Sequence, residues 1–202
     1  MKNIITIQHT QSVHHTNGMV GSWTDWPLTE KGLAQAKTIG ENLRRELAGR
    51  SVVLYTSDLT RAAQTAQTIG ESLGVRPIAR SELRERNLGS ACGQSVEWMH
   101  AHQTCFETTV DDRLFPDAES RRDEWNRLKP FFEELMAGPE QEILIVAHGD
   151  LLSVFNAMFM GLPPESLDSC EVFGLAGGVS QMQQDDRGRR RIKRISDLSY
   201  LK

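Results

Sequence analysis

Two short apolar runs, each ending abruptly at a histidine, constrain the fold of this chain most. Residues 4–7 are all β-branched and lead into Gln8 and His9, while residues 143–147, the most apolar run of the chain, lead into His148. Continuous runs of this kind are typical of strands buried on both faces of a sheet. We therefore expect both histidines at the carboxyl ends of buried strands.

Helical patterns alternate with these strands. Thr29 has the side chain of an N-cap and precedes apolar residues at helical spacing through residue 47. The other elements that the spacing predicts are a strand over residues 52–55 and helices over residues 59–73, about 118–136, and from Leu151 to the turn at Gly161. This alternation predicts an α/β fold in which a mostly parallel sheet is sandwiched by helices.

The rest of the chain is less regular. Residues 171–175 and 179–183 predict two late strands, and the basic run 187–194 predicts a solvated edge. From about residue 87 to residue 117 the periodicity weakens, which predicts a small cap within one domain over residues 1–202. The cap aromatics fit packing under a loop, which we favour, or an apolar specificity pocket; they are Trp98, Phe106 and Phe115.

The charge balance limits the partners. The 202 residues carry 23 Lys and Arg against 27 Asp and Glu, so the formal charge of −4 gives no overall attraction to nucleic acid or to an anionic membrane. No apolar run has the length of a spanning helix, and Cys92, Cys105 and Cys170 show no paired spacing. We expect a cytoplasmic protein without a disulfide framework or zinc knuckle, and a homodimer stays open as its assembly.

Four polar residues are candidates for one site. In parallel sheets ligands bind beyond the carboxyl ends of the strands, so His9 and His148 are expected to face one crevice. Arg61 lies in the first turn of a predicted helix, where a cation opposes the helix dipole unless an anion is bound there. Glu85 is flanked by arginines and, taken alone, favours an ion-paired surface residue.

Five motifs, in this order, closely resemble the histidine phosphatase superfamily in its phosphoglycerate-mutase-like branch. They are Gln-His-Thr at 8–10, Trp-Thr-Asp-Trp-Pro-Leu-Thr-Glu-Lys-Gly at 23–32, Ser-Asp-Leu-Thr-Arg-Ala-Ala-Gln-Thr at 57–65, Leu-Arg-Glu-Arg-Asn-Leu-Gly at 83–89 and Ala-His-Gly at 147–149. The resemblance spans residue 3 to about residue 183, and the combination is specific although no single motif is.

The resemblance implies a role for each matched residue. His9 is the nucleophile that becomes a phosphohistidine, Arg61 and His148 clamp the phosphoryl oxygens, and Glu85 protonates the leaving oxygen and later activates water. It also implies catalysis without a metal or cofactor. The candidate phosphate-binding residues are Gln8, Ser12, His15, Arg61, His148 and Gly149; for His15 the alternative is a loop residue without a phosphate role.

The sequence departs from the family pattern at the first motif. The usual Arg-His-Gly is replaced by Gln8-His9-Thr10, and an ungapped alignment places Met19 where the family has a second arginine. A neutral amide binds phosphate less strongly than a guanidinium. His14 and His15 lie in the same loop; they either restore part of the charge or, as we favour, have no phosphate role.

We therefore expect a metal-independent phosphomonoester hydrolase that acts on a small phosphorylated substrate through His9. Two alternatives stay open: a non-catalytic or nearly inactive phospho-ligand binding protein, favoured by Gln8 and Met19, and, less favoured, a phosphoglycerate mutase. His100 and His102 are two residues apart, so on a helix they face different sides and predict no metal site.

Overall fold

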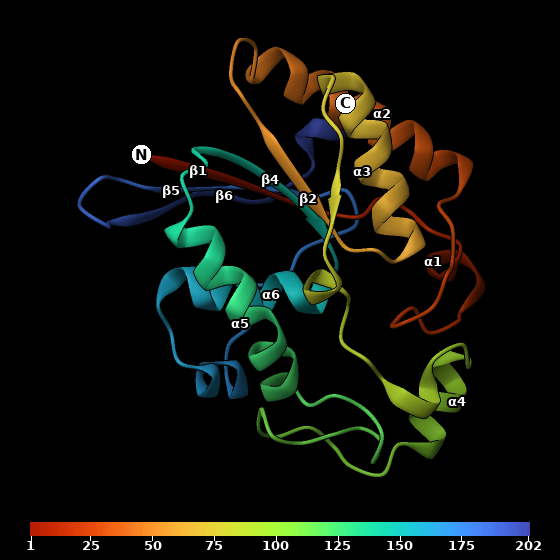
Figure 1. The fold of residues 1–202 in the computed structure, drawn as a ribbon. Helices are drawn as coiled ribbons and strands as arrows, with labels where there is room; N and C mark the ends of the chain where they lie inside the picture. Colours follow the sequence, from red (N-terminus) through yellow and green to blue (C-terminus); the bar gives the residue numbers. More distant parts are fainter.

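The computed structural model describes residues 1–202, and a six-stranded sheet with the order β3-β2-β4-β1-β5-β6 forms its centre (Figure 1). β1 to β4 run parallel, and β5 pairs antiparallel with both β1 and β6. The strands are β1 (Lys2–Gln8), β2 (Val53–Thr56), β3 (Ile78–Ala79), β4 (Glu142–Ala147), β5 (Val179–Gln184) and β6 (Arg190–Asp197). The mostly parallel α/β fold is confirmed.

Helices cover both faces of this sheet (Figure 1). The helices are α1 (His14–Asn17), α2 (Glu30–Glu46), α3 (Thr60–Leu73), α4 (Val96–His102), α5 (Arg121–Ala137) and α6 (Gly149–Met160). In β4, Ile143 and Ile145 pack into one apolar cluster with α5 and α6, whereas Leu144 and Val146 pack into a second cluster with α2 and α3. The strand therefore alternates between two cores, which explains its continuous apolar run.

Local signals set several helix ends. Thr29 caps α2, since its hydroxyl accepts a hydrogen bond from Gly32 N at 3.0 Å, as predicted. Ser120 and Asp123 form a capping box at the start of α5. α6 begins at Gly149, directly after His148, rather than at Leu151. The second histidine is thus the N-cap of a helix as well as the end of a strand.

The predicted strand over residues 171–175 is wrong. This stretch has no ladder hydrogen bonds; Leu175 N is instead bound by the Ser196 hydroxyl at 2.8 Å, and Phe173 remains 54% exposed. Alternating polar and apolar residues also occur in an extended loop, so the pattern alone does not require pairing. Conversely, the basic run enters β6, an edge strand whose charged side chains are mostly exposed.

The cap segment, residues 87–117, contains one short α-helix, α4, that the sequence did not indicate, and a 3₁₀ turn at Gly89–Ala91. Ser95 caps α4 through a bond from Trp98 N. The cap is joined to the loop after β1, because Val20 N donates to Gln94 O at 2.8 Å and Val96 N donates to Gly18 O at 2.9 Å. Loop and cap therefore form a shared wall beside the carboxyl edge of the sheet.

Two of the three cap aromatics pack under the loop, and the third, Phe106, is exposed. Trp98 stacks on Phe115 with ring centroids 5.8 Å apart and joins a small apolar cluster, which supports packing under the loop. Phe106 is 81% exposed.

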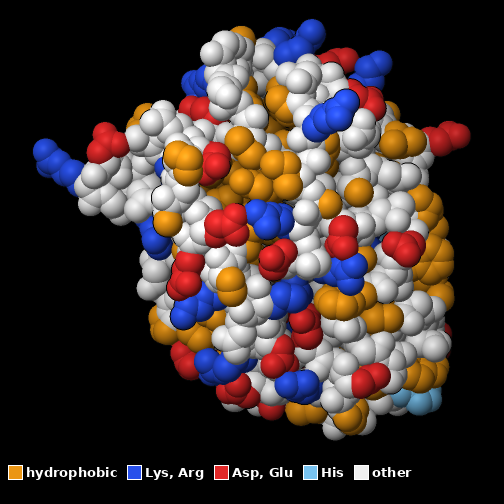
Figure 2. Space-filling model, viewed as in Figure 1, with side chains coloured by type: hydrophobic (Ala, Val, Ile, Leu, Met, Phe, Trp, Pro, Cys, Tyr) orange, Lys and Arg blue, Asp and Glu red, His pale blue; other side chains and the backbone are white.

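Over the face shown in Figure 2, acidic and basic side chains are intermingled rather than separated into patches of one sign. None of the helices is both long enough and apolar enough to cross a bilayer.

Candidate active site

His9 lies at the end of β1 with one ring nitrogen fixed. Its Nδ1 is 2.9 Å from the carbonyl oxygen of Thr10, and its Nε2 accepts a hydrogen bond from Arg61 Nε at 3.1 Å. A carbonyl oxygen can only accept, so Nδ1 carries the proton and Nε2 carries the unprotonated lone pair, to which Arg61 Nε donates. Burial, followed by the charge of Arg61, holds the pKa of His9 well below its usual value. The ring is therefore neutral and nucleophilic at Nε2.

Arg61 is completely buried in the first turn of α3. Its two terminal nitrogens donate to the carbonyl oxygens of Thr24 at 2.9 Å and Ser22 at 2.8 Å. These contacts hold the guanidinium beside His9 without neutralising its charge. Burial lowers the pKa of Arg61, but the group stays a cation at neutral pH. The arrangement places a fixed positive charge in direct contact with the unprotonated nitrogen of His9.

His148 faces His9 from the end of the neighbouring strand. The two ring centroids are 5.2 Å apart and the rings are tilted by 62°. His148 is fully buried, yet neither ring nitrogen has a hydrogen-bond partner. An unpaired buried polar group costs free energy, so its persistence points to a ligand. The N-terminus of α6 at Gly149 adds unpaired N–H groups beside it, which favour anions.

Glu85 approaches the same edge from the start of the cap. Its Oε1 accepts hydrogen bonds from Arg86 N and Leu151 N, both at 3.1 Å. Burial, together with the charge of Asp150, raises the pKa of Glu85 to about 7. A carboxyl group with this pKa holds a proton part of the time at neutral pH and can both give and take it. The surface ion-pair interpretation of Glu85 alone is therefore wrong.

The remaining predicted residues lie around this group. Gln8 is 9% exposed, and its Oε1 has no hydrogen-bond partner. Its Nε2 packs against Gly149 so closely that a Cβ at position 149 would lie 3.4 Å from it. Ser12 is buried and contacts both loop histidines: its hydroxyl lies 2.6 Å from Nδ1 of His14, and its N–H donates to Nδ1 of His15 at 3.2 Å.

The two loop histidines belong to the site, but they are not a source of charge in the free protein. His15 stacks on His9 with 8° between the rings, and His14 lies 5.7 Å from His9, centroid to centroid. Burial and the nearby cations lower the pKa of His15 and lower that of His14 to about 3. Both rings are therefore neutral near pH 7. A bound anion would raise their pKa values.

Several residues support the site although the sequence analysis assigned them no role. Trp23 donates from Nε1 to the Glu85 carbonyl oxygen at 2.6 Å, and Arg127 donates to the same oxygen at 3.2 Å. Arg86 pairs with Glu107 at 2.6 Å and with Asp150 at 3.3 Å. Trp23 lies within one of the quoted motifs, so it could have been singled out. The partners of the arginines depend on tertiary contacts and carried no local signal.

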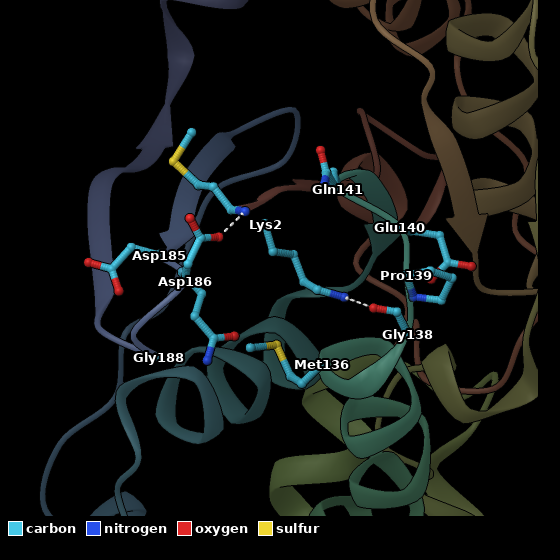
Figure 3. Close-up of a pocket in the computed structure, with 11 residues that line it drawn as sticks. Lys2, Met136, Gly138, Pro139, Glu140, Gln141, Asp185, Asp186 and Gly188 are labelled. Atoms are coloured by element: carbon cyan, nitrogen blue, oxygen red, sulfur yellow. Dashed lines mark hydrogen bonds and ion pairs between the residues drawn. The ribbon is translucent and has the colours of Figure 1, made fainter.

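A hollow at the other end of β1 is separate from this group (Figure 3). It lies at the amino end of the strand, between the end of α5 and the β5–β6 turn. The ammonium of Lys2 there donates to the carbonyl oxygens of Leu135 and Gly138 at 2.5 and 2.9 Å. These are the last carbonyls of a helix, which a cation stabilises. The contacts of Lys2 are thus explained by helix capping.

The fold and the site define an α/β protein whose histidines and buried arginine meet at the carboxyl edge of a parallel sheet. The family model of the histidine phosphatase superfamily (branch 1) matches residues 4–197. The chain therefore belongs to this superfamily, as the motifs predicted.

Relatives within the superfamily carry both phosphatase and mutase names. A protein from Hydrogenobacter thermophilus named "Putative phosphoserine phosphatase 2" is 30% identical over 172 residues, covering 83% of each chain. A 2,3-bisphosphoglycerate-dependent phosphoglycerate mutase from Bartonella quintana is 32% identical over 182 residues, covering 85% of this chain and 87% of the mutase.

Solved structures show the same fold. Bacillus stearothermophilus YhfR superposes with a TM-score of 0.85 at 23% identity and full coverage of both chains. A mycobacterial glucosyl-3-phosphoglycerate phosphatase in complex with inorganic phosphate superposes with a TM-score of 0.82 at 24% identity, covering 100% of this chain and 99% of the other. At these identities the likeness concerns the fold alone.

Proposed function

We propose that the chain is a phosphomonoester hydrolase that works through a phosphohistidine on His9. The observation that carries the proposal is the state of this imidazole: Nδ1–H is bound to the Thr10 carbonyl, so the unprotonated lone pair lies on Nε2, where it accepts a hydrogen bond from Arg61 Nε at 3.1 Å that a phosphoryl group would replace. A nucleophile and the charge that attracts a phosphoryl group are already side by side.

The first half-reaction transfers the phosphoryl group to the protein. Nε2 of His9 forms a bond to phosphorus while the bond from phosphorus to the ester oxygen breaks, and that oxygen takes the proton of Glu85 and leaves as an alcohol. Arg61, His148 and the N–H groups at the start of α6 hold the three phosphoryl oxygens. Gln8, Ser12 and His15 complete the phosphate contacts.

The second half-reaction returns the phosphoryl group to water. Ionised Glu85 takes a proton from a water molecule, the water oxygen bonds to phosphorus, and the bond from phosphorus to Nε2 breaks. Phosphate leaves, and His9 and protonated Glu85 are restored. In this proposal cationic and imidazole side chains supply the field, so a metal ion has no step to perform.

A phosphoglycerate mutase is the second candidate, because the Bartonella relative carries that name. A phosphoglycerate brings a carboxylate in addition to its phosphate, which needs cations in the cap. The cap segment contains one arginine, Arg113, and Asp123 already pairs with it at 2.7 Å. Its other charged residues are acidic: Glu97, Glu107, Asp111, Asp112 and Asp117. This balance favours a hydrolase over a mutase.

A non-catalytic phospho-ligand binding protein is the third candidate, since Gln8 and Met19 stand where the family resemblance leads us to expect arginine. The geometry of Glu85 argues against it. A protein that only binds phosphate has no use for a carboxyl group with a raised pKa beside a neutral nucleophile.

A panel of phosphate monoesters, assayed with and without EDTA, tests these candidates. We expect phosphate release at a rate that EDTA leaves unchanged. We expect no interconversion of 2- and 3-phosphoglycerate when 2,3-bisphosphoglycerate is added. Mutase turnover that exceeds phosphate release would replace the hydrolase. Phosphate binding without turnover of any ester would favour the binding protein, and metal-reversible inhibition by EDTA would exclude the metal-free mechanism.

A further inference from the structure

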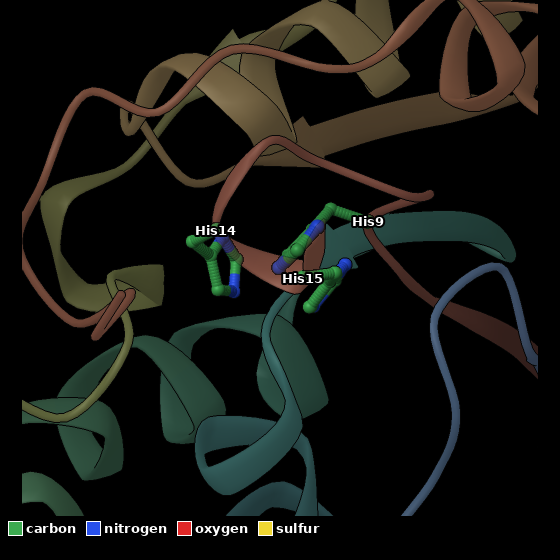
Figure 4. A group of neighbouring side chains, drawn as sticks. All are labelled: His9, His14 and His15. Carbon is green, nitrogen blue, oxygen red and sulfur yellow. The ribbon is translucent and has the colours of Figure 1, made fainter. Parts of the chain in front are cut away.

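Three imidazoles converge beside the sheet edge (Figure 4). One ring nitrogen from each of His9, His14 and His15 lies within 4.8 Å of the others. The rings of His14 and His15 have centroids 4.1 Å apart. The proposed phosphoryl transfer uses His9 as nucleophile and at most His15 as a phosphate contact. It gives no reason for a third histidine at this distance.

We propose that His9, His14 and His15 form a site for a divalent transition-metal ion such as Zn²⁺, and that the bound ion switches off the nucleophile. Imidazole nitrogens suit zinc, copper and nickel, whereas magnesium and calcium require oxygen ligands. Three histidine ligands and one open position are a recurrent zinc arrangement. Small ring rotations bring nitrogens that are under 4.8 Å apart to the separation that ligands of one ion require.

The loop after β1 holds the three rings against one another. The His15 ring stacks on that of His9 with 8° between the ring planes, and the centroid of His14 lies 5.7 Å from that of His9. Ser12 contacts both His14 and His15 and fixes them relative to β1. Arg61 Nε donates to Nε2 of His9 at 3.1 Å, so an ion must displace this hydrogen bond, and the guanidinium charge weakens the site further.

Metal binding and catalysis exclude each other in this arrangement. Nδ1 of His9 is committed to the Thr10 carbonyl, so the ion must use the Nε2 lone pair, which is also the pair that attacks phosphorus. The ion therefore acts as an inhibitor and not as a cofactor. The inference goes beyond the proposed hydrolase activity, because the ion binds the same imidazoles whether or not the chain turns over a phosphate ester.

Direct binding of Zn²⁺ to metal-free protein, measured by competition with a chromogenic chelator, tests the site. We expect one ion per chain in the wild type and an affinity at least about tenfold lower in His14→Asn. The double variant His100→Asn/His102→Asn is the matched control, because it removes two histidines of α4 and should keep wild-type affinity. Equal affinity of the wild type and His14→Asn would overturn the proposal.

Histidine NMR on the wild type makes the test independent of any variant's folding. Zn²⁺ should shift the ring signals of His9, His14 and His15 and leave those of His100 and His102 in place; the opposite pattern would overturn the site. In the activity assay Zn²⁺ should inhibit and excess EDTA should restore the rate. If the chain proves inactive on all esters, the binding and NMR results still decide the metal site, so the two proposals fail separately.

Discussion

Several polar groups at the sheet edge lack hydrogen-bond partners, whereas those of the cap are paired. At the edge, both ring nitrogens of His148 and the Oε1 of Gln8 are buried without a partner. In the cap, Asp112 accepts bonds from the backbone N–H groups of Thr108 and Thr109 at 2.8 and 2.7 Å, and Arg113 is paired with Asp123. At the sheet edge these unpaired groups are available to a ligand, whereas the paired groups of the cap fix the conformation of its loop. The difference assigns chemistry to the edge and a bounding wall to the cap.

The largest effect is expected at Glu85, where edge and cap meet. Glu85→Gln should lower kcat/KM on alkyl phosphates by about 10²–10⁴-fold, because their leaving oxygens need a proton. Nitrophenyl phosphate, whose leaving group needs none, should lose roughly tenfold at most. Steady-state rates on both substrates measure the contrast. A uniform loss on both substrates would mean that Glu85 positions a neighbouring group or acts through its charge, and does not donate a proton.

The pH dependence of the wild type sharpens this assignment. Because the pKa of Glu85 is raised to about 7, the proton donor is lost as pH rises through that value. The rate on an alkyl phosphate relative to nitrophenyl phosphate should therefore fall by up to about tenfold per pH unit above 7. Above pH 7 both esters are mainly dianions, so their own ionisation contributes little to the change in this ratio. A flat ratio from pH 5 to 9 would contradict the role of Glu85.

The next effect concerns Gln8, the edge residue with an unpartnered oxygen. Gln8→Arg adds a fixed charge, and since one oxyanion donor contributes about 10²–10³-fold, we expect a gain of at least about tenfold in kcat/KM. The longer side chain must fit between Gly149 and Gly174, which both approach the amide closely. A folded variant with lower activity would show that the pocket is built around glutamine.

Glu124, in the core behind the sheet edge, is a further buried polar group without hydrogen bonds. It is fully buried on α5 with neither carboxylate oxygen hydrogen-bonded, and burial, then the charge of Glu85, raises its pKa well above the usual value. The unfolded chain releases this proton above about pH 4.5, whereas the folded chain keeps it, so the wild type loses stability as pH rises.

Glu124→Gln removes that loss. The free energy of unfolding of the variant, minus that of the wild type, should rise with pH above about 4.5 by at most about 1.4 kcal/mol per pH unit. Urea unfolding of both proteins from pH 4 to 8 measures it. Glu124→Asp, which keeps a carboxyl group, is the control. A difference independent of pH would mean that Glu124 is ionised in the fold.

The smallest effect is expected in the cap. Phe106 is 81% exposed, so Phe106→Ser should change stability by less than about 0.5 kcal/mol. Activity on phenyl phosphate should change by less than about twofold by the same reasoning. A large loss restricted to aromatic esters would instead show that Phe106 contacts the substrate, and the apolar pocket interpretation would return.

Local signals explain why much of the architecture could be predicted. Three elements are indicated by patterns only a few residues long. These patterns are the β-branched residues of β1, the apolar run of β4 and the N-cap residue Thr29 of α2. His9 and His148 were placed at one edge because parallel strands end on the same side. These inferences need only the chain direction and the period of the side chains.

Other features depend on contacts distant in sequence. β6 forms because β5 provides an antiparallel partner, although its charged sequence, taken alone, predicts only a solvated edge. The raised pKa of Glu85 depends on burial and on Asp150, 65 positions further along the chain, and the approach of His14 to His9 depends on how the loop turns back. No pattern within a short window carries this information.

The central claim is that the unprotonated Nε2 of His9 takes the phosphoryl group. Wild-type protein mixed with ³²P-labelled ester and quenched without acid should carry a label that is stable in base, labile in acid, and located in the peptide that contains His9. His9→Ala should carry none, whereas the control His102→Asn should be labelled like the wild type. Equal labelling of His9→Ala, or turnover by it at the wild-type rate, would contradict the account.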